Sequence, residues 1–429
     1  MGRSPTPNLL LTASPAVAIF FPERPKLQLS EQQYSPQFQR RLAVTVAKTK
    51  SFEATATVID QWCDQPIQAK HVQVLATTIG QELLSERKAL VDEIVHHRRG
   101  ADQPDQQHDL AVVQVDGGRV RTRTTTGGKG AGVHGHQWRE DKVARLQTMQ
   151  SKTFPSDPCP EPPACFLRSE RWREFVAISP AKTGESTEVT LTPAPEATAP
   201  VVQEWQPKML VRTAVATLEA IDEFRWMVLA EAKRRNFFQA RRYAFLGDGN
   251  SSNWTMQQKL FPDFVPILDF CHAAGYVHAA ATALGALAES WIRDCWQGRV
   301  DEVVSQLEQL LLQRLAAGEV VSETHALYAV QRAITYLGNQ AEKMKYPEYR
   351  QQGLPVTTSL IESQIKEINF RMKGTEKFWN QKNAEAILQL VVSELRDDGQ
   401  GLEQFFERRQ TSVYRRPSKR NLTLARQAA

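Results

Sequence analysis

The chain has few cysteines and no apolar run long enough to cross a bilayer. Its five cysteines are scattered and odd in number, and none stands in a Cys-x-x-Cys pair, which argues against a disulfide framework and a zinc knuckle. An apolar stretch at residues 9–21 is short and is broken by Pro15, so it indicates neither a membrane span nor a signal peptide. We therefore expect a cytoplasmic protein that does not bind membranes.

Acidic residues are sparse in two segments of an otherwise balanced sequence. The 429 residues are 41% hydrophobic and 24% charged, with a net charge of +5, which is typical of a globular protein with two or three cores. No acidic residue interrupts the C-terminal basic positions Arg408, Arg409, Arg415, Arg416, Lys419, Arg420 and Arg426. Only Glu140 and Asp141 oppose a second basic stretch, Arg119, Arg121, Arg123, Lys129, Arg139, Lys142 and Arg145. Such blocks suit a polyanion such as DNA, although either block alone is also typical of a solvated surface or tail.

Two amphipathic helices are expected after an N-terminal segment of residues 1–50. Apolar residues recur at helical spacing from Phe52 to Trp62, Pro66 breaks the pattern, and Val72 to Leu83 resume it. The short break predicts a helix-turn-helix within residues 51–100. Its second helix would present polar side chains to DNA, namely Gln68, His71, Gln73, Thr77 and Thr78. Any helical hairpin in an ordinary bundle gives the same pattern.

A different pattern begins at about residue 108. Residues 110–115 predict a strand, Asp116-Gly-Gly118 a turn and residues 119–123 a returning strand. Gly127 to Gly135 predicts a flexible loop, and residues 154–205 predict a proline-rich irregular insert. A long helix over 210–236, strands over 242–247 and 264–268 and an alanine-rich helix follow. This order predicts an α/β sheet within residues 108–272.

The rest of the chain is predicted to be helical. Residues 273–356 predict a helical insertion, residues 357–396 a last helical part of the core, and residues 397–429 a basic tail. A helix beginning at Ser359 has Ile361, Ile365 and Ile368 on its apolar side. Glu362, Lys366 and Asn369 then share a neighbouring face, because they are spaced at i, i+4 and i+7.

Three carboxylates require a common explanation. They are Asp116 and Asp248, which each follow a predicted strand, and Glu362, which lies on a helix that must pack on the same sheet. Asp269 also follows a predicted strand, and functional groups gather at this end of the strands in open sheets. Gathering anions is costly unless cations bind among them. Mg²⁺ or Mn²⁺ is the natural candidate, as two ions that clamp the oxygens of a phosphoryl displacement. The alternatives are that each Asp-Gly is a turn and that Ser359-x-x-Glu362 is a capping box.

Motifs from about residue 51 to residue 409 together resemble the DDE transposases of bacterial insertion sequences, most closely the Kra-type family, which is related to mutator-like and ISL-type groups. The matching motifs, in chain order, are Asp116-Gly-Gly118, Gly247-Asp-Gly249, Trp254, Phe261-Pro262, Ile267-Leu-Asp269-x-x-His272, Tyr346-Pro-Glu-Tyr-Arg-x-x-Gly-Leu-Pro-Val356, Ser359-x-x-Glu362-Ser-x-x-Lys366, Arg371-x-Lys-Gly374 and Trp379. Thr357-Thr358-Ser359 stands where related groups often have Gly-Ser-Gly.

The resemblance implies a ribonuclease H-like core with an all-helical insertion before the last acidic residue. Asp116, Asp248 and Glu362 would be the catalytic triad: Asp116 would bridge two ions, and the other two would each hold one. Asp269-x-x-His272 would match a signature that such families carry near the active site, so His272 is a candidate catalytic residue. Water and then a DNA 3′-hydroxyl would be the successive nucleophiles.

The expected partner is double-stranded DNA, both the terminal inverted repeats and the target. Candidate contacts in the last part of the core and beside Asp248 are Lys366, Asn369, Arg371, Lys373, Trp254 and Trp379; both tryptophans are also typical of a core. Assembly on two DNA ends implies a homo-oligomer, associated with the nucleoid. Two other functions remain open: a transposase-derived regulator without catalysis, and a ribonuclease H-like nuclease that does not join strands.

Overall fold

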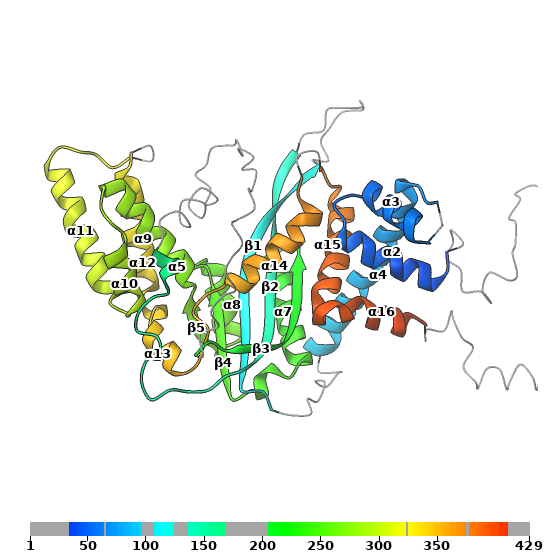
Figure 1. Ribbon diagram of the computed structural model, residues 1–429, viewed down its shortest axis with the longest axis horizontal. Coiled ribbons are helices and arrows are strands. Elements are labelled where there is room, and N and C mark those ends of the chain that lie inside the picture. The colour runs from blue at the N-terminus through cyan, green and yellow to red at the C-terminus, as the bar shows by residue number, and fades with distance from the viewer. Residues whose placement is uncertain are drawn as a thin grey trace, which may run out of the picture.

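A computed structural model describes residues 34–63, 66–96, 107–123, 136–167, 205–322, 325–374 and 377–410 (Figure 1). The predicted glycine-rich loop, most of the proline-rich insert and the basic tail beyond residue 410 lie outside these ranges. No helix in the described ranges is both long enough and apolar enough to cross a membrane.

One mixed sheet of five strands organises the fold and confirms the α/β prediction. The strands are β1 (Leu110–Arg123), β2 (His136–Gln150), β3 (Lys208–Thr217), β4 (Arg242–Gly247) and β5 (Val265–Leu268). Their order across the sheet is β3-β2-β1-β4-β5. β2 is antiparallel to β1 and β3, whereas β4 and β5 run parallel to β1.

The predicted turn at Asp116-Gly-Gly118 is wrong. β1 continues through these residues, and its antiparallel partner is β2, with Asp116 opposite Val143 and Gly118 opposite Asp141. A Cβ on Gly118 would come within 2.7 Å of Asp141 Oδ1. Gly118 therefore leaves space for the Asp141 side chain on the neighbouring strand. Glycine within a strand often marks such a close approach.

The predicted helix over residues 210–236 is also partly wrong. Residues 208–217 form β3, and α7 covers only Ile221–Arg234. The alternation of Val211, Thr213 and Val215 is a strand pattern, since β-branched side chains suit a pleated surface. The helical spacing that prompted the prediction holds only beyond the end of β3.

Alternate residues of β3 face two different cores. Val215 packs in the core that contains α7, whereas Ala214 and Ala216 pack with α14 (Ser359–Met372) and α15 (Gln381–Leu395). The sheet is thus covered on both faces, with α14 over β1 and β2. This arrangement brings the last predicted helix onto the strands that carry the candidate aspartates.

The predicted helical insertion is present as a lobe between β5 and α14 (Figure 1). It contains α9 (Phe270–Leu284), α10 (Glu289–Trp296), α11 (Val300–Ala316), α12 (Leu327–Gln340), the short 3-10 helix η2 (Ala341–Lys343) and α13 (Tyr346–Gln351). The segment that follows β2, including α5 (Ala164–Leu167), crosses to this lobe. There Arg350, which is fully buried, donates two hydrogen bonds to the Asp157 carboxylate, at 2.8 and 2.5 Å.

The N-terminal helices pack against the last part of the chain. They are α2 (Pro36–Lys48), α3 (Phe52–Cys63) and α4 (Ala69–Val95), and the last described helix is α16 (Gln400–Gln410). The two helices of the predicted helix-turn-helix are present. α4 extends well beyond the predicted helix, however, and packs extensively along α15. A Cβ on Gly80 of α4 would lie 2.0 Å from the carbonyl oxygen of Ala386 in α15.

Replacing Gly80 by Ala is expected to lower the free energy of unfolding by about 1–3 kcal/mol, because the methyl group meets a backbone carbonyl that cannot rotate away. Gly338→Ala is the matched control, since a Cβ at this glycine within α12 has no neighbour within 4 Å. The control should gain about 0.5–1 kcal/mol from helix propensity. Urea unfolding of both variants checks the prediction, and equal stability of Gly80→Ala and the wild type would contradict the close packing of α4 on α15.

Candidate active site

Three aspartates lie side by side on the three parallel strands. The pairing of β1 with β4 ends at Gln114 and Leu246, and two residues further along both strands are Asp116 and Asp248. The pairing of β4 with β5 ends at Gly247 and Leu268, which are followed by Asp248 and Asp269. Because paired strands are about 4.8 Å apart, all three residues gather at one level of the sheet, with Asp116 inside β1 and the other two directly after β4 and β5.

Asp116 is the most perturbed of these carboxyl groups. Burial raises its pKa to about 7; the positive charge of His272 and the hydrogen bond from the Gly117 N–H, at 2.7 Å, oppose the rise, and the charges of Asp248 and Asp269 add to it. Without a bound cation, the Asp116 carboxyl group is therefore protonated in a large fraction of the molecules at neutral pH. The side chain lies on the same face of the sheet as α14, because Val143, opposite it on β2, packs in the α14 core.

The loop after β4 holds Asp248 from two sides. Its Oδ1 accepts hydrogen bonds from the Asn250 N–H, at 3.0 Å, and from Asn253 Nδ2, at 2.9 Å, at the start of α8 (Ser251–Leu260). From the helical lobe, the Tyr336 hydroxyl donates to the Asp248 carbonyl oxygen at 2.8 Å. Gly249 has φ +90°, and a Cβ there would lie 2.8 Å from the Tyr336 ring. Glycine is thus required next to Asp248 both for conformation and for space.

Asp269 is fully buried and caps α9. Its carboxylate accepts hydrogen bonds from the Thr358 N–H at 2.8 Å, from the Cys271 N–H at 3.3 Å and from His272 Nδ1 at 2.7 Å. Burial opposes ionisation of both partners, but the bond and charge between them dominate: the pKa of Asp269 is lowered, and that of His272 is raised to about 9. The raised pKa favours the imidazolium form of His272, whose positive charge offsets that of the neighbouring carboxylates.

Glu362 reaches this group from α14. One of its carboxylate oxygens, a carboxylate oxygen of Asp269 and Cys271 Sγ all lie within 4.8 Å of one another. No other trio of potential metal ligands among the residues placed by the structure meets this criterion, so Asp116, Asp248 and Glu362 do not meet it together. We call Asp116, Asp248, Asp269 and Glu362 the acidic cluster.

The capping-box alternative for Glu362 is wrong. Thr358 is the N-cap of α14, and its carbonyl oxygen accepts the N–H of Glu362 at 3.1 Å. Glu362 is thus the fourth helical residue, one position beyond that of a capping-box glutamate. Arg145 of β2 fixes this turn to the sheet by donating to the Leu360 carbonyl oxygen at 2.9 Å. Arg145 belongs to the basic stretch of the sequence, but its side chain is buried and has a structural contact.

The acidic cluster offers carboxylate oxygens, which hard cations prefer. The one trio of potential ligands within 4.8 Å among the described residues also includes the Cys271 thiol, which is a softer donor. The raised pKa of Asp116 shows that ionisation of this carboxyl group is opposed by burial and by the neighbouring anions, and a cation would relieve both effects. Asp269 already accepts hydrogen bonds from His272, Cys271 and Thr358.

No protein-family model matches this chain, and a search of curated proteins finds no match either. The geometry of the acidic cluster and its surroundings therefore carries the functional argument.

The predicted DNA contacts on and just after α14 separate into two groups. Lys366 and Lys373 are exposed and Asn369 is half-buried, at the i+4, i+11 and i+7 positions from Glu362. Arg371 is only 1% exposed, donates to the Lys50 carbonyl oxygen at 2.8 Å and lies over the Phe52 ring at 4.3 Å. Arg371 is therefore too buried to contact phosphates as predicted. Its contacts join α14 to α3.

Both candidate tryptophans lie inside the fold. Trp254 is 7% exposed and packs beneath Gly247, while Trp379 is 8% exposed and donates from Nε1 to the Met372 carbonyl oxygen at 2.8 Å. In this structure neither ring is presented to a base, so the core interpretation applies. On α4, His71 is exposed and Gln73 is half-buried, which is compatible with their predicted contact with DNA.

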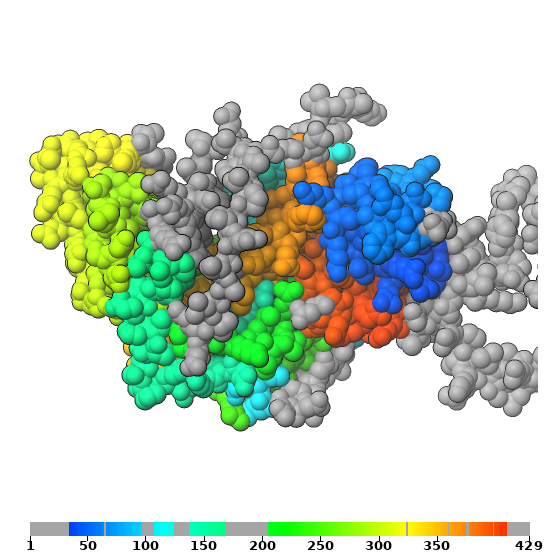
Figure 2. Space-filling view, in the orientation of Figure 1, coloured from blue at the N-terminus to red at the C-terminus, as the bar shows by residue number. Residues whose placement is uncertain are grey.

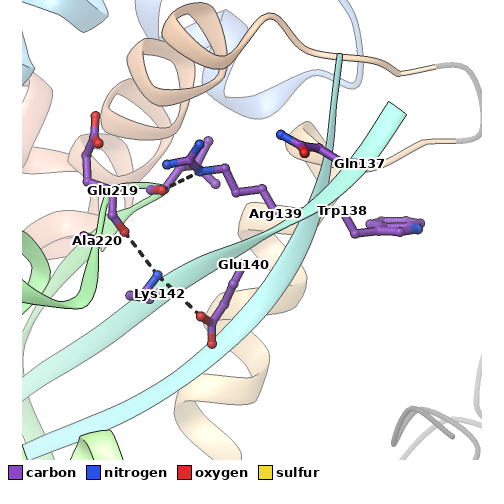
Figure 3. A pocket seen from close by; sticks show the side chains of 8 residues that line it. Gln137, Trp138, Arg139, Glu140, Lys142, Glu219 and Ala220 are labelled. Atoms are coloured by element: carbon purple, nitrogen blue, oxygen red, sulfur yellow. Dashed lines mark hydrogen bonds and ion pairs between the residues drawn. The ribbon is translucent and has the colours of Figure 1, made fainter. Parts of the chain in front are cut away.

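Two hollows of the described surface lie away from the acidic cluster. One, of about 370 Å³, is lined by residues of β2 and by Leu218, Glu219 and Ala220 (Figure 3). There Arg139 Nε donates to the Leu218 carbonyl oxygen at 2.7 Å, and Lys142 Nζ to that of Glu219 at 3.1 Å. The other, of about 490 Å³, lies at the start of β4. Neither is lined by a member of the cluster.

Asp141 provides a pH-dependent test of the region between β2 and α14. It is fully buried, and burial raises its pKa to about 6 although Lys373 opposes the shift. Between about pH 4 and pH 6 the unfolded chain has lost this proton and the folded chain retains it, so the stability falls as the pH rises. Asp141→Asn removes this loss, and its stability relative to the wild type should grow by about 2–3 kcal/mol from pH 4 to pH 7. Denaturant unfolding at both pH values checks it; a constant difference would contradict the raised pKa.

Proposed function

We propose that the protein is a DDE transposase that cleaves and joins DNA strands in a Mg²⁺-dependent phosphoryl transfer. The observation that carries this proposal is the placement of Asp116 and Asp248 at one level of neighbouring parallel strands, with Glu362 of α14 reaching the same cluster through Asp269. Convergence of acidic groups from distant parts of the chain is unfavourable in itself, and this favours a functional explanation over a structural one.

The sheet supports a ribonuclease H-like core. Three antiparallel strands in succession are followed by two strands parallel to the first, on its other side. The helical lobe enters between β5 and α14, before the last acidic residue, as the resemblance to insertion-sequence transposases implies.

In this proposal the chain supplies the ligands and fixes their geometry. Asp116, Asp248 and Glu362 would hold the ions, and the contacts of Asn253 and Tyr336 keep Asp248 in place. Bound Mg²⁺ would supply Lewis-acid stabilisation of the charge that develops on the phosphate oxygens. Water and then a DNA 3′-hydroxyl are the proposed nucleophiles. The Asp269–His272 pair contributes one positive charge that balances the carboxylates and holds α9 against the Thr358 N–H.

DNA is the proposed partner. α3 and α4 would bind the terminal inverted repeats through residues such as His71 and Gln73. Lys366 and Lys373, which are exposed, would bind phosphates near the cleaved bond. Binding of two DNA ends would require at least two copies of the chain.

The test is a cleavage and joining assay on DNA that carries the gene with its native flanks. A transposase predicts Mg²⁺-dependent breaks at the element ends, with 3′-hydroxyl termini, followed by joined products. Cleavage without joining would favour a structure-specific nuclease, and binding without cleavage would favour a regulator.

A further inference from the structure

β1 and β2 continue as a two-stranded ribbon beyond the rest of the sheet (Figure 1). β4 stops pairing with β1 at Gln114, and β3 stops pairing with β2 at Lys142. Residues 118–123 and 136–141 then pair only with each other, apart from a single bridge between Thr122 and Trp379. We call these two segments the ribbon. It begins two residues after Asp116.

The two faces of the ribbon differ in character. On the inner face, Val120 and Thr122 are buried on the side of α14 and Trp379. Strand alternation places Arg119, Arg121 and Arg123 on the opposite, outer face. Arg119 and Arg123 are exposed, and Trp138, opposite Arg121 on β2, is 46% exposed. The basic stretch of the sequence thus becomes a row of arginines along one side of a ribbon.

An aromatic ring lies on each side of the central arginine. The Arg121 guanidinium carbon is 4.7 Å from the Trp138 ring centroid and 5.9 Å from that of Phe378. The segment that carries Phe378 is held to β1 by hydrogen bonds from the Arg123 N–H to the Trp379 carbonyl oxygen, at 2.8 Å, and from the Trp379 N–H to that of Arg121, at 3.1 Å. Stacking restricts the guanidinium while leaving the Trp138 ring 46% exposed, so both groups are accessible on the outer face.

The spacing of the outer arginines matches the dimensions of a DNA duplex. Arg119 and Arg123 are four residues apart on an extended strand, hence about 13 Å, and the major groove of B-DNA is about 12 Å wide and accepts a two-stranded ribbon. The one acidic residue on the outer face of the described ribbon is Glu140, which lies 3.4 Å from Lys142 Nζ. The charge of this face is therefore positive.

We propose that the outer face of the ribbon binds duplex DNA across its major groove. Arg119 and Arg123 contact the phosphates on the two sides of the groove. Arg121 and Trp138 lie between these two arginines and face the groove. The binding itself does not depend on the proposed catalytic function.

The salt dependence of duplex binding tests the two outer arginines. The full chain and its Arg119→Gln/Arg123→Gln variant are titrated onto a fluorescent duplex of mixed sequence over a series of KCl concentrations. Loss of two phosphate contacts should reduce the slope of log Kd against log salt by about 1.8. Arg241→Gln/Lys259→Gln carries the same charge change on two exposed residues at the opposite end of the strands and should leave the slope close to wild type. Equal slopes for all three proteins, or equal losses in both variants, would overturn the proposal.

Trp138 gives a second, independent test. Trp138→Ala should weaken duplex binding by about two- to fivefold, because Arg121 loses the ring that fixes it, and Trp138→Phe should retain most of the affinity. Unchanged duplex affinity of Trp138→Ala, or a loss confined to a single-stranded probe, would contradict duplex binding by this face. Asp301→Asn, which removes an exposed carboxylate of α11, should leave these affinities unchanged. The ribbon can thus be confirmed even if no cleavage is found, and cleavage can be confirmed even if the ribbon variants bind normally.

Discussion

Replacing Asp116 or Asp248 by Asn is expected to lower the rate of Mg²⁺-dependent DNA cleavage by about a thousandfold or more. Each change removes one anionic oxygen that would hold a metal ion, and the loss of several kcal/mol of charge stabilisation in the transition state corresponds to a factor of this size. The shape of the side chain is retained, so the fold and DNA binding should persist. At position 248 the amide oxygen can still accept the hydrogen bonds of Asn250 and Asn253.

Asp301→Asn is the matched control, since Asp301 is an exposed carboxylate on α11 in the helical lobe. It should cleave at the wild-type rate. The measurement is single-turnover cleavage of a labelled DNA end, with binding followed on the same DNA. Wild-type cleavage by Asp116→Asn or Asp248→Asn would remove that aspartate from the proposed site.

Glu362→Gln should separate stability from activity. Loss of one anion relieves repulsion within the acidic cluster, so the melting temperature without metal should stay the same or rise. The same change removes a charged ligand, so stabilisation by added Mg²⁺ should shrink, and cleavage should fall by about a thousandfold. Because α14 begins at Ser359 and Glu362 is past the capping position, no loss of a helix cap complicates the result.

Glu367→Gln is the control for this variant, since Glu367 is an exposed residue of the same helix. Its melting temperature, response to Mg²⁺ and cleavage rate should match those of the wild type. Thermal melts with and without Mg²⁺, together with the cleavage assay, give all three quantities. Near-normal cleavage by Glu362→Gln would reduce this residue to a structural role and would remove the three-carboxylate site.

Local sequence patterns were sufficient for much of the fold. The strand ending at Gly247, the strand ending at Leu268 and the helices of the lobe lie where they were predicted, because alternation and helical spacing are properties of a few adjacent residues. Because Asp248 and Asp269 directly follow these two strands, their position at the same edge of the sheet could be predicted from the strand ends. β3 was missed because the helical spacing that begins at Leu218 was extended back across a β-branched strand.

Contacts between distant segments could not be predicted in this way. Gly117 and Gly118 are typical turn residues, and only pairing with Asp141 and its neighbours on β2 reveals a continuous strand. Burial of Arg371 depends on Phe52, more than 300 residues earlier in the chain. The hydrogen bond from the Thr358 N–H to Asp269 joins two segments separated by the whole lobe.

The most direct test is a measurement of divalent-metal binding. It tests the proposal that Asp116, Asp248 and Glu362 together hold the catalytic cations. Mn²⁺ is titrated into the protein bound to a duplex, and free Mn²⁺ is followed by electron paramagnetic resonance, with the duplex alone as background. We predict binding of up to two ions per chain for the wild type and for Asp301→Asn, and at least about tenfold weaker binding for Asp116→Asn, Asp248→Asn and Glu362→Gln, since each has lost a charged ligand. Wild-type affinity and stoichiometry in all three variants would contradict the proposed site.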